Sequence, residues 1–213
     1  MSETQPATDR LFIAFEVPTD VKERLADVIG RLKSECVRVG VPSRAIKWVD
    51  AHTIHLTTQF LGDTPRRDIE NIRQALSDVH ADSVHTDSVH ANSDRAPFTL
   101  QSRTTGAFPN LHRPRVIWCD LAGADLTRMK NTVETITNRL IALNFPLDRK
   151  PFKPHLTLGR IRRDTQPFSL QPIVVKTTFE PIVITFTSLT LFKSKLTREG
   201  SIHTPVQTWS FVE

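Results

Sequence analysis

Two copies of a short pattern hold the side chains best suited to acid and base chemistry, His55-Leu56-Thr57 and His155-Leu156-Thr157. Each copy lies in an apolar run, at 53–61 and 152–160, that favours a β-strand over a helix. Because side chains alternate between the two faces of a strand, each His shares a face with its Thr. An imidazole has an ordinary pKa near neutrality, so two of them on rigid strands indicate paired acid and base catalysis.

Strand alternation also predicts which neighbours accompany the two histidines. The side chains expected to point inward are Ile54, Leu56, Thr58, Phe60, Leu156 and Leu158. Gln59 should share the face of His55 and Thr57. Arg160 has the wrong parity to share the face of His155. A strand end, a twist or a β-bulge near Gly159 is therefore required if Arg160 is to face the same site.

Length and charge limit the number of domains and the kind of binding partner. Its 213 residues suffice for one compact unit, and 28 Lys and Arg against 23 Asp and Glu give a formal charge of +5. This surplus favours an anionic partner, although basicity of this size is common and does not by itself establish a nucleic-acid partner. The basic residues that gather near the second motif are Arg113, Arg115, Lys150, Lys153, Arg160, Arg162 and Arg163.

Cysteine usage and hydropathy indicate the compartment. Cys36 and Cys119 are far apart in the sequence and have no metal-ligand spacing, which favours a reducing environment. The first residues are polar and lack the apolar segment of a signal peptide, and no apolar run approaches the length of a membrane span. We therefore expect a cytoplasmic monomer that is not associated with a membrane.

The elements that must position the motifs are predicted from apolar periodicity. An apolar run at 11–17 predicts a buried central strand, and helical spacing predicts helices over 19–33, 65–79 and 126–144. Further strands are expected at 45–50, 97–103, 115–121, 182–192 and 204–212. Residues 104–110 read as a loop, and 169–179 are compatible with a strand or a short helix.

Two segments stand apart from this pattern. Residues 1–9 are expected to form a disordered tail before a single domain over 10–213. A five-residue repeat at 79–93, Val-His-Ala/Thr-Asp/Asn-Ser, matches neither helix nor strand periodicity. Its histidines and aspartates could ligate a metal ion, but a duplicated polar tract favours a flexible insertion at about 80–95.

The two motif copies lie about half a chain apart, among short strands and helices. This order predicts an α+β fold of two similar lobes, each a mostly antiparallel sheet with flanking helices. The motif strands would line a central cleft between the lobes.

With these residues in place, the sequence resembles the two-histidine phosphoesterase superfamily, and within it the RNA 2′,3′-cyclic phosphodiesterases once described as 2′-5′ RNA ligases. Besides the motifs, the segments that support the resemblance are 11–15, 47–49, 60–62, 106–109, 113–118, 154–160 and 191–196. The histidine-rich repeat departs from the family pattern. The resemblance implies a bilobal fold with pseudo-twofold symmetry, both histidines in one cleft, and no metal or other cofactor.

The implied reaction is hydrolysis of RNA 2′,3′-cyclic phosphate ends to 2′-phosphates. Water must attack phosphorus in line with the departing O3′, so a base and an acid are needed on opposite sides. His155 is expected to accept the proton of water and His55 to donate a proton to O3′, although the symmetry makes these roles hard to separate. Thr57 and Thr157 would donate hydrogen bonds to the phosphate, and Arg160 would offset its charge.

Aromatic residues could bind the rest of the substrate. Phe12 and Trp48 are candidates for stacking on a base, as aromatic side chains do with single-stranded RNA, and core packing is the alternative for both. The remaining histidines, His52, His112 and His203, are expected at the surface or in local hydrogen bonds.

Other functions fit the same residues. The same acid and base would serve 2′-5′ joining of RNA ends, or hydrolysis of another cyclic or 2′-5′-linked nucleotide, because a reaction and its reverse use the same groups. A binding module without turnover would keep the cleft but would not explain two intact motifs. In each case the expected partner is an RNA end or a small cyclic nucleotide.

Overall fold

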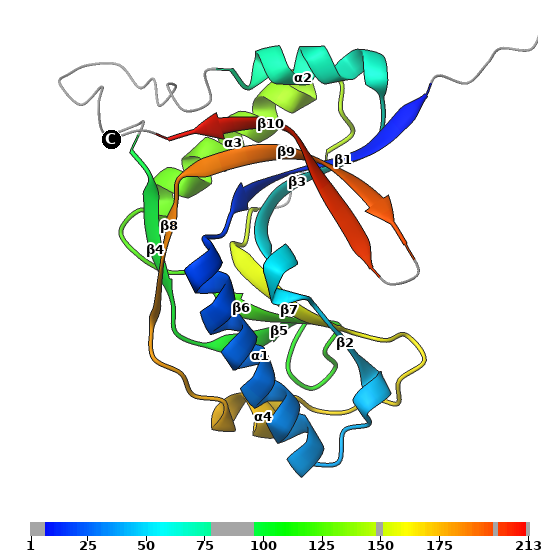
Figure 1. The fold of residues 1–213 in the computed structure, drawn as a ribbon, viewed down its shortest axis with the longest axis vertical. Helices are drawn as coiled ribbons and strands as arrows, with labels where there is room; N and C mark the ends of the chain where they lie inside the picture. The colour runs from blue at the N-terminus through cyan, green and yellow to red at the C-terminus, as the bar shows by residue number, and fades with distance from the viewer. Residues whose placement is uncertain (1–6, 78–95, 148–150, 198–199, 212–213) are drawn as a thin grey trace, which may run out of the picture.

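The computed structural model describes residues 7–77, 96–147, 151–197 and 200–211 (Figure 1). The predicted insertion at about 80–95 lies outside these ranges, as do residues 1–6. The predicted tail is wrong for Thr8 and Asp9, which begin the first strand. Asp9 forms ion pairs with Lys193 at 2.6 Å and with Arg66 at 3.3 Å. No helix in the described ranges has both the length and the apolar character needed to cross a membrane.

One antiparallel sheet, termed sheet A, contains the first motif and has the strand order β10-β9-β1-β3. Its strands are β1 (Thr8–Glu16), β3 (His55–Pro65), β9 (Ser188–Leu196) and β10 (Ser201–Ser210). β1 lies between β9 and β3, and its residues 11–15 are buried, which confirms the predicted central strand.

A second antiparallel sheet, termed sheet B, contains the second motif in the order β2-β7-β6-β5. Its strands are β2 (Ile46–Trp48), β5 (Thr105–Phe108), β6 (Val116–Asp120) and β7 (His155–Ile161). A separate pair is formed by β4 (Phe98–Ser102) and β8 (Ile182–Phe186). Sheet B takes β2 from the N-terminal part of the chain, and sheet A takes β9 and β10 from the C-terminal part. The lobes therefore share both halves of the chain.

The helices and short 3-10 turns connect these strands. The helices are α1 (Thr19–Arg38), α2 (Ile69–Ala75), α3 (Leu126–Ala142) and α4 (Gln171–Lys176). The 3-10 turns are η1 (Ser43–Ala45), η2 (Ala51–Thr53) and η3 (Arg66–Asp68). α1 and α3 bury the apolar stripes that predict them, but α1 extends beyond the predicted end at residue 33 to Arg38 and also buries Cys36.

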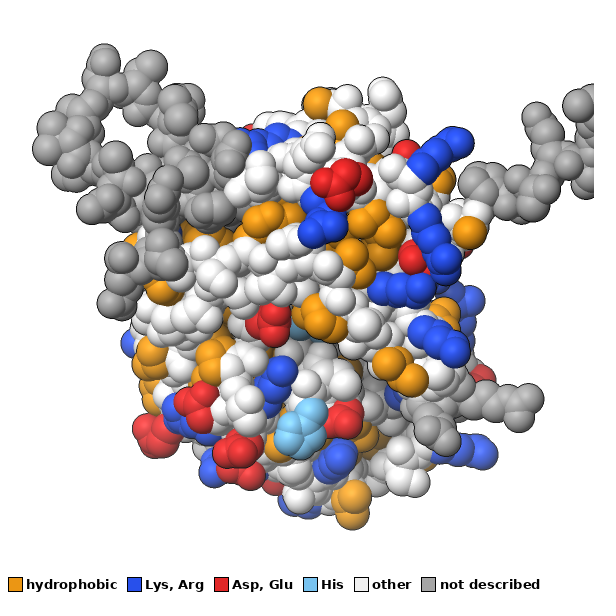
Figure 2. Space-filling view, turned by 45° about the horizontal axis from the view of Figure 1, so that its top comes forward, with side chains coloured by type: hydrophobic (Ala, Val, Ile, Leu, Met, Phe, Trp, Pro, Cys, Tyr) orange, Lys and Arg blue, Asp and Glu red, His pale blue; other side chains and the backbone are white. Residues whose placement is uncertain are grey.

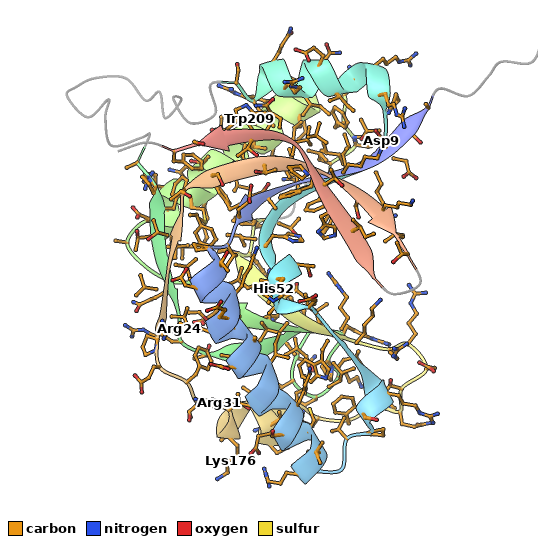
Figure 3. All side chains as sticks on the ribbon, viewed as in Figure 1. Asp9, Arg24, Arg31, His52, Lys176 and Trp209 are labelled. Atoms are coloured by element: carbon orange, nitrogen blue, oxygen red, sulfur yellow. The ribbon has the colours of Figure 1, made fainter. Side chains whose placement is uncertain are left out.

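Each long helix lies beside the sheet to which its preceding strand does not belong. α1 follows β1 of sheet A and lies toward sheet B, whereas α3 follows β6 of sheet B and lies beside sheet A (Figure 1). α1 and α4 lie together at the sheet B end of the molecule, and Arg31 of α1 donates to the carbonyl of Thr178 at 2.7 Å (Figure 1). Figure 3 shows Arg31 and Arg24 on α1, with Lys176 on α4 close to the end of α1. α3 contacts sheet A, where Gln59 of β3 donates to the hydroxyl of Thr137 at 2.6 Å.

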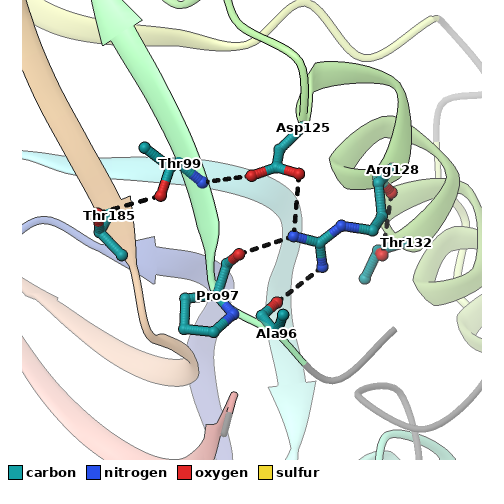
Figure 4. A network of polar contacts seen from close by, with 7 residues as sticks. All are labelled: Ala96, Pro97, Thr99, Asp125, Arg128, Thr132 and Thr185. Carbon is teal, nitrogen blue, oxygen red and sulfur yellow. Dashed lines mark hydrogen bonds and ion pairs between the residues drawn. The ribbon is translucent and has the colours of Figure 1, made fainter. Parts of the chain in front are cut away.

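A polar network ties the beginning of α3 to β4 (Figure 4). The Arg128 guanidinium donates to the carbonyls of Ala96 and Pro97, both at 2.7 Å, and pairs with Asp125 at 3.2 Å. Asp125 also accepts a hydrogen bond from the amide of Thr99 at 2.8 Å. Because the planar guanidinium is fixed by three partners, it holds α3 in position beside the cleft.

Several predicted boundaries are wrong. Residues 104–110 contain the strand β5, because Gly106 leaves room for the Trp118 ring; an added Cβ would lie 2.4 Å from it. The run 182–192 is two strands, β8 and β9, in different sheets. Pro65 ends β3 instead of beginning a helix. For 169–179, where the sequence is compatible with a strand or a short helix, the structure has the short helix α4. The predicted class is nevertheless confirmed, because all pairings of the described strands are antiparallel and helices flank both sheets.

Candidate active site

Both motif histidines begin their strands and are held by the same local hydrogen bond. His55 Nδ1 lies 2.8 Å from the carbonyl oxygen of Thr53, and His155 Nδ1 lies 2.7 Å from that of Lys153. A carbonyl oxygen only accepts, so Nδ1 carries the proton in each neutral ring. Nε2 is therefore the nitrogen of each imidazole that is left for proton transfer.

An aromatic ring supports each imidazole. The centroids of Phe12 and His55 are 4.8 Å apart, with the rings tilted by 32°. The centroids of Phe108 and His155 are 5.0 Å apart, with the rings nearly perpendicular at 88°. Together with the Nδ1 hydrogen bond, these contacts fix the direction of each ring. The aromatic support of His155 comes from β5, the strand that the sequence did not predict.

Burial lowers the pKa of both imidazoles. The pKa of His55 falls to about 4, mainly through desolvation, with smaller contributions from the positive charges of His203, Lys22 and Arg160. Desolvation also lowers the pKa of His155, and Arg160 adds to the effect. Both rings are therefore mainly neutral near pH 7 in the free protein, and the pKa of His55 lies well below the near-neutral value expected from the sequence.

A β-bulge in β7 brings Arg160 to the face of His155. The ladder with β6 shifts register between Thr157 and Gly159, which leaves Leu158 as an extra residue. An extra residue reverses the alternation of the side chains that follow it. Arg160 consequently lines the cleft together with His155 and Thr157. The irregularity that the sequence required near Gly159 is present.

A β-bulge also occurs in β3. The ladder with β1 shifts register after Thr57, which leaves Thr58 as an extra residue. Thr58 is buried as predicted, but the prediction that Phe60 points inward is wrong, because its side chain is 65% exposed and lines the cleft. Phe60 stands three residues after Thr57, as Arg160 stands three residues after Thr157.

The motif strands line one cleft with two arms. Four residues line both arms and mark the junction between them: Thr57, Phe60, Thr157 and Arg160. The hairpin arm passes His55 between β2 and the β9–β10 hairpin and has a volume of about 610 Å³. The α3 arm passes His155 between β7 and α3 and has a volume of about 1160 Å³. His55 thus lines one arm and His155 lines the other, and each arm also contains the four junction residues.

The polar groups at the junction are available to a ligand. The hydroxyls of Thr57 and Thr157 form no hydrogen bond with any described residue, and the Arg160 guanidinium forms no ion pair within the same part of the chain. Gln59 borders the α3 arm, but its amide is bound to α3. Because Thr58 is the extra residue, Gln59 pairs with Ile13 and does not lie on the face of Thr57, so the predicted shared face is wrong. Two hydroxyl donors and one guanidinium suit the oxygens of a phosphate group.

The two aromatic candidates have different positions. Phe12 borders the hairpin arm but is 3% exposed, and the rings of His55, Phe192 and His203 pack against it, which leaves little of its ring for stacking on a base. Its alternative, core packing, is the one that its burial supports. Trp48 is half-buried and lines the hairpin arm, which leaves its predicted stacking role open.

His203 is a site residue that the sequence did not indicate. Its ring centroid lies 5.1 Å from that of His55, and it lines the hairpin arm, so the predicted surface position is wrong. The pairing of β10 with β9 places it there, and no local pattern predicts that register. His112 is exposed as predicted, and so is His52, which Figure 3 labels on η2.

Basic side chains line both arms. Arg10 and Lys47 belong to the hairpin arm, and Lys130 and Lys153 belong to the α3 arm. Figure 2 shows Lys and Arg side chains gathered along one side of the molecule. Of the predicted basic group, Lys153 and Arg160 line the cleft, and Lys150 lies outside the described residues. The other members, Arg113, Arg115, Arg162 and Arg163, are exposed and line neither arm.

Comparison with known proteins places this geometry in a family. A family model described as the 2′-5′ RNA ligase superfamily matches residues 17–198. The RNA 2′,3′-cyclic phosphodiesterase of Archaeoglobus fulgidus is 32% identical over 155 residues, which are 72% of this chain and 73% of that protein. The protein of the same name from Methanocaldococcus jannaschii is 26% identical over 203 residues, covering 94% and 99% of the two chains.

Solved structures share the fold. Escherichia coli LigT complexed with 3′-AMP has a TM-score of 0.66 at 20% identity, covering 97% of this chain and 99% of LigT. TT0787 of Thermus thermophilus has a TM-score of 0.63 at 24% identity, covering 95% and 97%. These likenesses support the two-lobed architecture independently of the motif residues.

Proposed function

The chain belongs to the 2′-5′ RNA ligase superfamily, and on that premise we propose that it hydrolyses RNA 2′,3′-cyclic phosphate ends by metal-independent acid and base catalysis between His55 and His155. The observation that carries the proposal is the matched setting of the two imidazoles. Each has Nδ1 bound to the carbonyl two residues before it, and each lines one of the two arms that meet at the junction. Relatives named RNA 2′,3′-cyclic phosphodiesterase support the substrate.

The cyclic phosphate would lie at the junction of the two arms. There Thr57 and Thr157 would donate to its non-bridging oxygens, and Arg160 would stabilise the charge that develops in the transition state. Water adds to phosphorus while the bond from phosphorus to O3′ breaks. One imidazole takes a proton from the water and the other gives a proton to O3′, so the product is a 2′-phosphate with a free 3′-hydroxyl.

The roles of the two histidines remain a proposal. The sequence-based assignment makes His155 the proton acceptor and His55 the proton donor. The low pKa of His55 favours its neutral form and hence the opposite assignment in the free protein. An anionic phosphate at the junction would raise the pKa of both rings and weaken that preference.

A modified leaving group separates the two assignments. Sulfur in place of O3′ leaves without needing a proton, so a 3′-thio cyclic phosphate bypasses the proton donor. If His55 is the donor, the 3′-thio substrate restores turnover to His55→Ala and not to His155→Ala. Restoration of His155→Ala alone would reverse the assignment.

The reaction itself is tested with a short RNA that bears a 2′,3′-cyclic phosphate, with 2′- and 3′-phosphate products resolved. We expect 2′-phosphate as the main product and unchanged turnover in EDTA. No product from any RNA end or cyclic nucleotide, with tight binding retained, would favour a binding module. Joined 2′-5′ products would favour the ligase alternative, and complete inhibition by EDTA would contradict the metal-independent mechanism.

A further inference from the structure

The proposed hydrolysis leaves the α3 arm without an assigned occupant. A water molecule needs little room beside phosphorus. The α3 arm nevertheless has a volume of about 1160 Å³, against about 610 Å³ for the hairpin arm. Sites for single small ligands typically hold ~300–1,000 Å³. The cleft is therefore larger than one cyclic nucleotide requires.

The chemistry of ribose relates the two arms to different parts of an RNA end. The cyclic phosphate bridges O2′ and O3′. The base leaves the sugar at C1′, beside C2′, whereas the chain to the preceding nucleotide leaves at C4′, beside C3′. A ribose whose phosphate lies at the junction therefore directs its base toward one arm and its 5′ side toward the other. With the 5′ side in the α3 arm, O3′ faces His155, which corresponds to the assignment that makes His155 the proton donor.

The hairpin arm has the walls of a base site. The half-buried ring of Trp48 packs on Gly159, where an added Cβ would lie 3.1 Å from the ring. Ile202, from β10 of the hairpin, also lines this arm and is 57% exposed. An aromatic ring and an exposed apolar side chain in one arm suit a planar base of any identity.

The α3 arm has the walls of a site for the RNA backbone. α3 buries one stripe in the core. Its other side presents four exposed polar residues to the arm: Lys130, Asn131, Glu134 and Asn138. Lys153 faces them from the segment before β7. Neither Lys130 nor Lys153 forms an ion pair with a described residue. Of the described residues that line the α3 arm, Glu134 alone has a carboxylate. The arm thus has a positive surplus for a phosphodiester.

Phe60 provides a ring at the entrance of this arm. It is 65% exposed and lies at the junction, because the bulge in β3 turns it out of the core. A large exposed aromatic side chain beside unpaired lysines is the combination that binds single-stranded nucleic acid, with the ring stacking on a base and the amines contacting phosphate.

We infer that the α3 arm binds the nucleotide preceding the cyclic phosphate end, with Lys130 and Lys153 at its linking phosphate and Phe60 at its base. The preferred substrate is then an RNA end of two or more nucleotides, and a free cyclic mononucleotide fills only the hairpin arm and the junction. This inference rests on the proposed function and specifies its substrate.

Two substrates test the inference: 2′,3′-cyclic AMP and the dinucleotide ApA ending in a 2′,3′-cyclic phosphate. We expect kcat/KM to be at least about tenfold higher for the dinucleotide, which corresponds to ~1.4 kcal/mol. Lys130→Ala and Lys153→Ala should each lower the ratio of the two kcat/KM values about three- to tenfold. Added salt should lower the same ratio, since the extra contact is to a phosphate.

Matched controls separate local from general effects. Lys33 is an exposed lysine of α1 outside both arms, so Lys33→Ala removes the same charge and should leave the ratio unchanged. Lys130 and Lys153 are exposed, and melting curves will verify that their variants are folded. Two independent variants on opposite walls keep the test decisive if one of them is unstable.

The possible outcomes distinguish failure of this inference from failure of the proposed hydrolysis on which it rests. If neither substrate is hydrolysed, the proposed function fails. If both are hydrolysed with equal kcat/KM, the function stands and the inference is overturned. The inference is also overturned if the dinucleotide is preferred but neither lysine variant changes the ratio, because the preference then arises elsewhere.

Discussion

The strands β3 and β7 repeat one construction with different final side chains. In both, a His begins the strand and a bulge follows the Thr, so that the third residue after the Thr turns into the cleft. That residue is Phe60 in β3 and Arg160 in β7. The comparison shows that the two strands supply one imidazole each, whereas among the described junction residues the positive charge comes from β7 alone.

The surroundings of the two histidines differ as well. His55 lies among the rings of Phe12, Phe192 and His203, while the ring contact of His155 within the described residues is with Phe108. The more enclosed His55 has its pKa lowered to about 4, mainly by desolvation. Similar hydrogen bonds therefore hold two imidazoles whose protonation responds differently to pH.

Loss of either histidine should have the largest effect. His55→Ala and His155→Ala are each expected to lower kcat about 10²- to 10⁴-fold, because each removes one of the two proton-transfer groups. The measurement is single-turnover hydrolysis of a cyclic phosphate RNA. His52→Ala and His112→Ala remove exposed imidazoles and serve as controls. Near wild-type turnover of either His55→Ala or His155→Ala would contradict a mechanism that uses both histidines.

The difference between Arg160 and Phe60 should give the next largest effect. Arg160→Ala is expected to lower kcat/KM about 10²- to 10³-fold, since it removes a cation from the transition state. Phe60→Ala should lower kcat/KM about five- to tenfold, at the lower end of the ~1–3 kcal/mol that stacking on a base is worth, because the ring is 65% exposed. Arg163→Ala removes an exposed guanidinium outside both arms and is the matched control. A greater loss in Phe60→Ala than in Arg160→Ala would refute the division of roles.

The two threonines test the symmetrical part of the comparison. Thr57→Val and Thr157→Val keep the shape of the side chain and remove one hydroxyl, so each should lower kcat/KM about tenfold. The double variant should lose about a hundredfold if the two donors act independently. A clear inequality between the single variants would show that the phosphate lies closer to one strand.

The smallest expected effect is the dependence of stability on pH that follows from the lowered pKa of His55. By NMR, His55 should titrate near pH 4 and His155 below 6.5, the ordinary value for an imidazole. For His55 the folded-state pKa lies below the unfolded one, so the unfolded chain binds a proton first as the pH falls. His55 therefore lowers stability progressively as pH falls from about 6.5 toward 4.

Urea unfolding at pH 7 and pH 4.5 measures this contribution. His55→Gln should lose less stability between the two pH values than the wild type, because the buried titrating group is gone. His112→Gln, at an exposed site, should behave as the wild type does. Equal losses in the wild type and His55→Gln would contradict the lowered pKa of His55.

The sequence predicts the chemistry of the site better than its extent. The repeated motif identifies His55 and His155, and strand alternation correctly places Thr57 and Thr157 beside them. Apolar periodicity predicts α1, α3 and β1, because each buries a continuous stripe or run. The short strand β5 is missed, since a Gly in a four-residue strand looks like a turn until its partner ring is known.

The sequence by itself determined the two motif imidazoles and the face that each shares with its threonine, because alternation within a strand is a local property. Tertiary structure decided which further side chains join them. Arg160 and Phe60 enter the cleft through bulges whose position depends on the neighbouring strand, and His203 arrives through the pairing of a distant hairpin. Register between strands is set by contacts far apart in the chain, which no local pattern records.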